Sequence, residues 1–174
     1  MTSEPTRIAG AWLLTPTMHE DPRGSFRETY RAATLEALGL RTDFVQENVS
    51  ESTHGVLRGL HYTDGMAKLT QVVDGETYHV IADLRPDSPT YRMWQAFEFS
   101  ARAPALLYVP PGVANGFYVV SARATIHYKQ TRYYDPAIEH RVRWNDPALG
   151  VIWPVADPRL SDQDRDAPDL TFPS

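Results

Sequence analysis

Cysteine is absent from this 174-residue chain, so it can form no disulfide, no thiolate metal site and no cysteine nucleophile. Lysine is scarce as well, because Lys68 and Lys129 stand against 15 arginines. Acidic residues are in excess and the formal net charge is −5, which excludes the overall basic field that binds nucleic acid. An anionic ligand would therefore have to be held by local arginines.

Long apolar runs are missing too. The first residues, M-T-S-E-P-T-R, contain no signal-peptide core, and no later run reaches transmembrane length. We therefore expect a cytoplasmic protein that does not enter a membrane. The length suits one domain with a sizeable core. Because no repeat, low-complexity tract or linker divides the chain, residues 1–174 are predicted to form a single domain.

The remaining pattern predicts short strands separated by turns. One helix is expected at 31–40, ending at Gly39, and the 14 prolines disfavour other long helices. Turn motifs such as D-G, R-P-D-S-P, P-P-G and Y-D-P separate strands expected at 69–73, 77–83, 92–100, 105–109, 116–120 and 124–130. This regular spacing predicts an all-β jelly-roll barrel. The segment after Asn145 should pack on it as loops and helical turns.

Residues 55–68, G-V-L-R-G-L-H-Y-T-D-G-M-A-K, are the most informative segment. Arg58 lies within an apolar strand, where a buried guanidinium would need an anion. His61, just after that strand run, is either structural or a general base that works near neutral pH. Lys68 is either an edge lysine with a solvated head or a buried ammonium facing an oxyanion. Together these residue types predict proton chemistry on a negatively charged substrate.

For inversion, a general base must act together with a general acid and with a group that orients the base. Tyr128 lies on an alternating strand, where its side chain either lines the barrel or donates a proton opposite the base. A carboxylate that orients His61 could come from the S-D-Q-D segment, but spacing does not separate Asp164 from Asp162 or Asp166.

Other side chains could bind a nucleotide. Arg23, in the turn D-P-R-G, is either solvated or bound to phosphate, for which a bidentate guanidinium is well suited. Tyr133 and Tyr134 either pack or stack on a planar ring.

We expect no metal. Metal-binding cupins usually carry an H-x-H pair, a distal glutamate and a later histidine. Here His61 precedes tyrosine and threonine, and Asn115 stands where the later histidine would be. His79 and His127 are interpreted as ordinary strand residues. The chemistry is therefore predicted to need no metal or other cofactor.

A series of motifs covers about residues 8–170: D-P-R-G-S-F-R-E, F-V-Q-E-N-V-S, G-V-L-R-G-L-H-Y, A-K-L-T-Q-V-V-D-G-E, D-L-R-P-D-S-P-T-Y, P-P-G-V-A-N-G-F, Y-K-Q-T-R-Y-Y, R-W-N-D-P-A-L-G-V-I-W-P and L-S-D-Q-D. In this order they resemble the dTDP-4-dehydrorhamnose 3,5-epimerase family of deoxysugar biosynthesis. The resemblance implies a metal-independent, cupin-type jelly roll with short peripheral helices. It also implies a homodimer that exchanges N-terminal strands and acts on a dTDP-4-keto-6-deoxyhexose at C3, C5 or both.

The resemblance also implies roles for single residues. The base falls on His61, its carboxylate partner on Asp164, the oxyanion-stabilising lysine on Lys68 and the acid on Tyr128. Phe26 and Tyr134 would stack on thymine. The full set expected to contact nucleotide or sugar, partly in the partner subunit's site, is Arg23, Phe26, Glu28, Gln46, Asn48, Arg58, Asn115 and Tyr134.

Two departures from the family pattern lie near the expected sugar pocket. The usual P-P-G-F-A-H-G-F carries Val113 and Asn115 here, and the loop at 62–67 is short. We therefore expect a specialised enzyme that acts at one carbon or on an unusual 4-keto sugar, in secondary metabolism such as antibiotic biosynthesis. The alternatives are a cupin isomerase or cyclase with a non-nucleotide substrate and a non-catalytic sugar-nucleotide binder.

Overall fold

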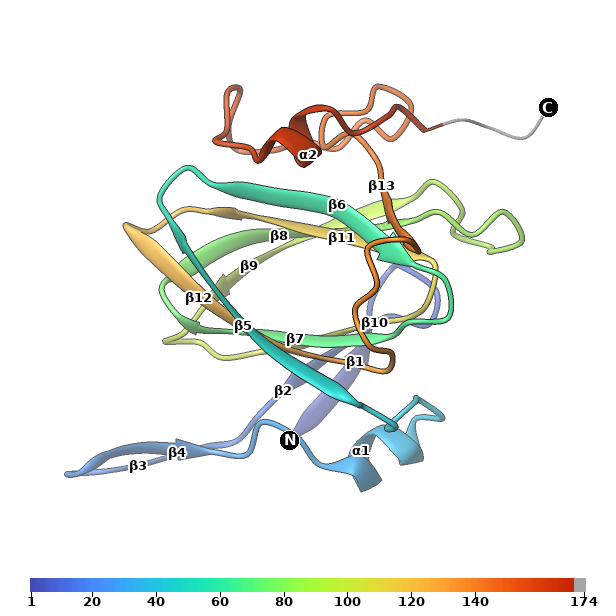
Figure 1. The fold of residues 1–174 in the computed structure, drawn as a ribbon. Coiled ribbons are helices and arrows are strands. Elements are labelled where there is room, and N and C mark those ends of the chain that lie inside the picture. Colours follow the sequence, from blue (N-terminus) through green and yellow to red (C-terminus); the bar gives the residue numbers. More distant parts are fainter. Residues whose placement is uncertain (171–174) are drawn as a thin grey trace.

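Two antiparallel sheets face each other in the computed structural model, which describes residues 1–170 (Figure 1). The six-stranded sheet contains, in spatial order, β1 (Thr2–Pro5), β2 (Trp12–Thr15), β10 (Leu106–Val109), β7 (Lys68–Asp74), β12 (Arg123–Gln130) and β5 (Gln46–Thr53). The five-stranded sheet contains β13 (Glu139–Arg141), β6 (Leu57–Thr63), β11 (Val113–Val119), β8 (Glu76–Asp83) and β9 (Trp94–Ser100). The remaining elements are the hairpin β3 (Met18–Asp21) and β4 (Gly24–Arg27), and the helices α1 (Ala32–Ala37) and α2 (Asp162–Arg165).

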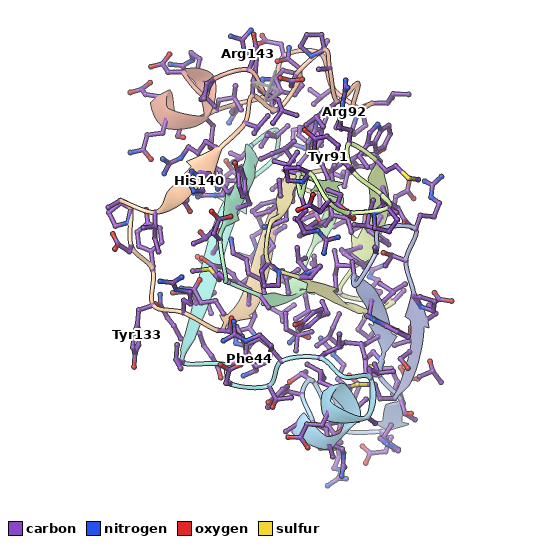
Figure 2. The ribbon with its side chains drawn as sticks, turned by 90° about the vertical axis from the view of Figure 1, so that its right-hand side faces the viewer. Phe44, Tyr91, Arg92, Tyr133, His140 and Arg143 are labelled. Carbon is purple, nitrogen blue, oxygen red and sulfur yellow. The ribbon has the colours of Figure 1, made fainter. Side chains whose placement is uncertain are left out.

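Side chains point alternately to the two faces of each strand, and the apolar ones form a core of three layers. On β10, Leu107 and Val109 point between the sheets, whereas Leu106 and Tyr108 point outward against the segment that contains α1. In that outer layer the Phe44 ring (Figure 2) meets the ring of Tyr30 edge-on at 5.6 Å. Such alternation is what a strand with both faces covered requires.

The C-terminal segment covers the outer face of the five-stranded sheet, where α2 lies over β6 in Figure 1. Trp153 and Trp144 pack there with β8 and β11, and the Trp153 indole donates a hydrogen bond to the Trp144 carbonyl at 2.8 Å. This arrangement confirms the predicted jelly roll with short peripheral helices. No helix within residues 1–170 is long and apolar enough to span a membrane.

The predicted elements agree with the observed ones to different degrees. β7, β8, β10 and β12 begin and end within one residue of the predicted bounds. The observed helix α1 is shorter than the predicted helix at 31–40. Gly39 follows its end with a positive φ of 69°, as expected of a glycine at a helix C-terminus. β6 runs on to Thr63, so His61 lies within a strand and not just after one.

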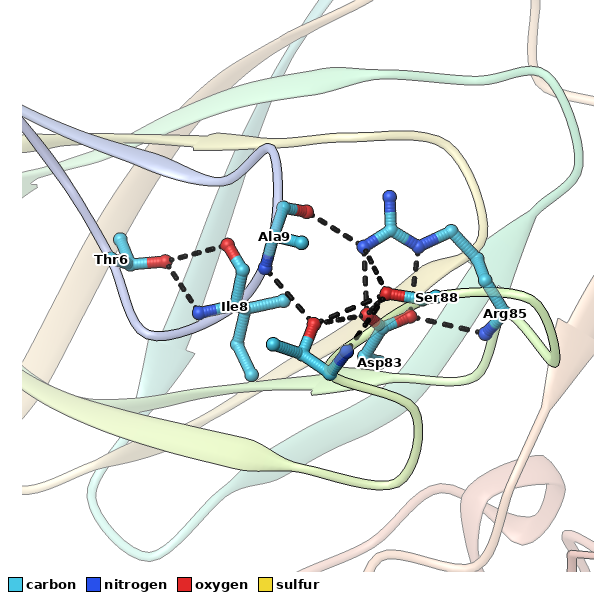
Figure 3. A network of polar contacts seen from close by, with 7 residues as sticks. Thr6, Ile8, Ala9, Asp83, Arg85 and Ser88 are labelled. Atoms are coloured by element: carbon cyan, nitrogen blue, oxygen red, sulfur yellow. Dashed lines mark hydrogen bonds and ion pairs between the residues drawn. The ribbon is translucent and has the colours of Figure 1, made fainter.

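A polar network anchors the N-terminal loop to the end of β8 (Figure 3). The fully buried Asp83 carboxylate accepts hydrogen bonds from Arg85, Ser88 and Thr90. Arg85 also donates to the Ala9 carbonyl, and the Ala9 N–H donates to Thr90 Oγ1 at 3.0 Å. Burial alone would raise the pKa of Asp83, but these hydrogen bonds hold that pKa below its usual range. The buried charge is therefore fully paired and fixes the loop in place.

Candidate functional site

A cavity of about 330 Å³ lies between the two sheets. Strands of both sheets line it, together with the segment before β13 and the segment at α2. It brings together seven of the residues predicted from the sequence: Arg58, His61, Lys68, Asn115, Tyr128, Tyr134 and Asp164.

A histidine–carboxylate pair occupies one wall. His61 Nε2 lies 2.5 Å from Oδ1 of the buried Asp164, and Ser161 donates to the other carboxylate oxygen at 2.9 Å. Burial alone would raise the pKa of Asp164, but the hydrogen bond and charge of His61, with smaller effects of Ser161 and Arg141, hold it below its usual range. A fixed carboxylate is thus available to orient the imidazole and to stabilise its protonated form.

The structure selects among the three aspartates that spacing left open. Asp162 pairs with Arg165 on the surface at 2.7 Å, and Asp166 is an exposed residue that ends α2. Only Asp164, among these three, faces β6. The Ser161 hydroxyl accepts a hydrogen bond from the Asp164 N–H and caps the short helix in this orientation.

Lys68 enters the cavity from the six-stranded sheet. Its strand, β7, lies between β10 and β12, so the alternative of an edge lysine is wrong. Burial lowers the pKa of Lys68, partly opposed by the charge of Glu139. Within residues 1–170 the ammonium has no hydrogen bond or ion pair at contact distance, so its donors are free for a ligand.

Tyr128 also enters from the six-stranded sheet, on the inward face that it shares with Ile126. Burial raises its pKa, Glu139 adds to this effect, and Arg58 opposes it. The phenol therefore keeps its proton at neutral pH. Because His61 belongs to β6 in the five-stranded sheet, the imidazole and the phenol approach the cavity from opposite sheets.

Arg58 departs from the prediction of a buried guanidinium. Its side chain is exposed, lines the opening of the cavity and donates from Nε to Ser52 Oγ at 3.0 Å. The guanidinium charge of Arg58 is therefore accessible to solvent in this chain.

Asn115 and Tyr134 complete the predicted lining. Asn115 Nδ2 donates to the His61 carbonyl at 3.1 Å and so braces the strand that carries the base. The half-exposed Tyr134 donates from its backbone N–H to Gln46 Oε1, and Gln46 donates to Asn48. Gln46 and Asn48 thus lie beside the cavity without lining it.

The hairpin residues lie elsewhere. β3 and β4 project away from the barrel (Figure 1), where Arg23 pairs with Asp21 at 2.5 Å and Phe26 is 72% exposed. Glu28, just after the hairpin, pairs with Arg31. None of the three predicted ligands on this segment lines the cavity of its own chain.

Tyr133, which the sequence allowed as a stacking residue, points into solvent (Figure 2) and is 72% exposed. It does not line the cavity.

Sequence reasoning missed His79, a residue of the cavity wall. It was interpreted as an ordinary strand residue, but it lies on the inward face of β8 and is 2% exposed. Burial, and to a smaller extent the charge of Lys68, lowers its pKa to about 3. The alternation that places the neighbouring Ile81 inside the barrel could have revealed it. His127 lies on the other face of β12 and pairs with Glu47.

The acidic and basic residues of β13 were also missed. Glu139 and Arg141 pair at 2.5 Å and both line the cavity. They follow a turn without an apolar pattern, so the sequence carries no signal for them. Within residues 1–170, no group of three or more histidine, aspartate or glutamate side chains is placed to hold a metal ion.

Comparisons with known proteins agree with this fold. The sequence matches the model of the dTDP-4-dehydrorhamnose 3,5-epimerase family over residues 5–171. It is 40% identical over 168 residues to the dTDP-4-dehydrorhamnose 3,5-epimerase of Salmonella typhimurium, covering 94% of this chain and 92% of the relative.

Two solved structures from streptomycetes are similar throughout. One is NovW of Streptomyces spheroides, a 4-keto-6-deoxy sugar epimerase from the novobiocin biosynthetic gene cluster, with a TM-score of 0.93, 38% identity and coverage of 97% and 87% of the two chains. The other is ChmJ of Streptomyces bikiniensis, a 3′-monoepimerase in complex with dTDP-quinovose, with a TM-score of 0.90, 37% identity and coverage of 95% and 86%.

Proposed function

Because this chain belongs to the dTDP-4-dehydrorhamnose 3,5-epimerase family, we propose that its cavity enolises a dTDP-4-keto-6-deoxyhexose and returns the proton to the opposite face of the sugar. The chain is a carbohydrate epimerase of deoxysugar biosynthesis that acts at C3, C5 or both. One observation carries the residue assignment: the His61–Asp164 pair, Lys68 and Tyr128 line the same cavity, with base and acid on opposite sheets.

The base in this mechanism is His61. A ketone at C4 acidifies the protons on C3 and C5, so a neutral imidazole can remove one of them. Because the ionised carboxylate of Asp164 can only accept a hydrogen bond, the proton of the neutral imidazole is on Nε2. The lone pair that accepts the sugar proton is then on Nδ1. The Asp164 carboxylate then stabilises the imidazolium.

Lys68 and Tyr128 complete the cycle. The free ammonium of Lys68 stabilises the enolate oxygen at C4. The phenol of Tyr128, kept protonated by burial, donates a proton to the carbon from the other side, which inverts it. Each positioned acid or base is typically worth ~10²–10⁴-fold in rate.

The nucleotide would hold the sugar in place. Arg58 at the opening of the cavity is suited to the diphosphate, and Tyr134 to stacking on thymine. Gln46 and Asn48, hydrogen-bonded next to Tyr134, would extend this surface toward the nucleoside. Remote binding energy of this kind orients the reacting carbons.

A homodimer would supply the remaining contacts. Arg23, Phe26 and Glu28 would reach the partner subunit's cavity through exchange of the N-terminal strands. Support comes from the projecting β3–β4 hairpin, which leaves the Phe26 ring without cover in one chain.

We further propose inversion at one carbon only, or an unusual 4-keto sugar, with Asn115 as the reason. Its amide is held by the His61 carbonyl and cannot relay a proton near neutral pH. Asn115→His should add a second inversion, seen by NMR of the product as an inverted configuration at a second carbon. A variant that yields the wild-type product would contradict this role.

Solvent deuterium tests the function itself. Incubation with dTDP-4-keto-6-deoxyglucose in D₂O should place label at C3, C5 or both, and NMR of the product identifies the inverted carbon. His61→Ala should lose exchange, whereas His127→Ala, on the outer face of β12, should keep it. Absence of exchange by the wild type, with normal dTDP binding, would indicate a non-catalytic binder, and absence of both would favour a non-nucleotide substrate.

A further inference from the structure

His79 is a polar group without a partner in the wall of the cavity. Its Nε2 is buried and has no hydrogen-bond partner within residues 1–170, although the residue lines the same space as His61 and Lys68. A buried polar atom left unpaired is unfavourable, so its position calls for a ligand atom.

Aromatic side chains of the neighbouring strands surround the His79 ring. β8 lies between β11 and β9, and the His79 ring contacts the Phe99 ring at 5.6 Å and the Phe117 ring at 6.1 Å. Apolar rings therefore flank it, while its edge borders the cavity.

The imidazole is also a hydrogen-bonding group and not a proton carrier. With a pKa lowered by burial and by Lys68 to about 3, it is neutral under working conditions. A neutral imidazole offers one donor and one acceptor. A hydroxyl, which can both donate and accept, matches it in either tautomer.

We propose that His79 determines specificity by hydrogen bonding to a ring hydroxyl of the ketosugar. The inference rests on the proposed function. A 4-keto-6-deoxyhexose linked to dTDP carries free hydroxyls at C2 and C3, and its ketone oxygen is directed to Lys68 in the mechanism above. The C2 or C3 hydroxyl is therefore the sugar group left for His79, and this contact holds the ring against the base.

The test compares binding of unreactive ligands by calorimetry: dTDP, dTDP-6-deoxyglucose, and the 2-deoxy and 3-deoxy derivatives of the latter. Wild type should bind dTDP-6-deoxyglucose about tenfold more tightly than one of the two deoxy derivatives, as expected for one buried hydrogen bond. His79→Phe, with a ring of similar size, should lose this discrimination and keep the affinity for dTDP. His79→Gln, which retains an amide near the Nε2 position, should keep most of it.

Three results would overturn the proposal. One is equal wild-type affinity for all three sugar ligands, and another is unchanged discrimination in His79→Phe. The third is equal loss of affinity for dTDP and for the sugars, which would show a structural role. Deuterium exchange by the wild type is scored separately, so a failure of the proposed catalysis can be told from a failure of the His79 contact.

Discussion

The clearest prediction for a single residue concerns Asp164. Asp164→Asn keeps the shape and an acceptor oxygen but removes the charge that stabilises the His61 imidazolium. We expect kcat to fall by roughly 10²–10⁴-fold, with little change in dTDP affinity. The matched control is Asp162→Asn in the same helix, which removes a surface pair with Arg165 and should leave kcat intact. Steady-state kinetics on both variants decides the role, and similar effects would contradict it.

The ionisation of Lys68 should determine the alkaline side of the pH profile of kcat. Burial lowers its pKa, so the ammonium loses its proton at a lower pH than an exposed lysine would. Burial raises the pKa of Tyr128, which moves the loss of its proton to higher pH. We therefore attribute the alkaline decline of kcat to Lys68, because the enolate loses its cation. Lys68→Arg keeps a positive charge to much higher pH.

The expected result is therefore a lower kcat for Lys68→Arg near neutral pH, since a planar guanidinium places its donors differently, with the alkaline decline moved to higher pH. Lys129→Arg is the control, because Lys129 pairs with Glu47 on the outer face; its profile should match the wild type. An alkaline decline that Lys68→Arg leaves in place would rule out Lys68 as its source.

At the scale of elements, alternation and turn motifs were sufficient for the central strands. β7 and β8 carry apolar residues on both faces and are followed by Gly and Pro turns, whereas β12 alternates apolar and polar residues, so the bounds of all three follow from the sequence. The short strands β1, β3 and β4 are largely exposed and have no such pattern. The predicted burial of Arg58 was wrong because apolar neighbours in a strand do not fix the exposure of a single side chain, and Arg58 is exposed.

Residue spacing along the sequence could not predict contacts between distant elements. Asp164 and His61 are 103 residues apart, and the pair forms because the C-terminal segment packs over β6. The resemblance to the family selected Asp164, whereas spacing alone left three aspartates open. His79 was misjudged for the opposite reason: its strand was predicted correctly, but its face was not considered.

Because β6 and β11 approach closely, we expect a strong effect when a single methyl group is added at Gly59. Gly59 has a φ of 131°, and a Cβ there would lie 2.5 Å from Gly116 Cα and 3.0 Å from the Asn115 carbonyl oxygen. Gly59→Ala should therefore push apart the strands that carry His61 and Asn115. We expect a loss of about 1–3 kcal/mol in the free energy of unfolding, measured by urea denaturation, together with a loss of activity.

Gly24→Ala provides the matched control. Gly24 has the same φ of 131°, but no atom lies within 4 Å of its would-be Cβ. This variant carries the conformational strain without the clash. If both variants lose the same free energy of unfolding, the close approach of β6 and β11 is not the cause.

At the scale of the whole molecule, residue types and resemblance predicted seven of the sixteen residues that line the cavity of one chain. The structure does not test three further predictions. The cytoplasmic location, the single-domain organisation and the exchanged homodimer stay predictions. A barrel with a separate hairpin is compatible with exchange, because β3 and β4 pair with each other and with no strand of either sheet in the described chain.

Complementation tests this exchange directly. If Arg23 serves the partner subunit's cavity, a mixed dimer of an Arg23→Ala subunit and a His61→Ala subunit has one site with both residues intact and one with neither. Arg23→Ala alone should weaken substrate binding by about 10–100-fold, as expected for a charged hydrogen bond. Mixing should then restore activity, because random pairing makes about half of the dimers mixed and about a quarter of all sites intact. Coexpression with two affinity tags isolates the mixed dimer. No gain over the parent variants, or a monomer by light scattering, would place Arg23 outside any shared site.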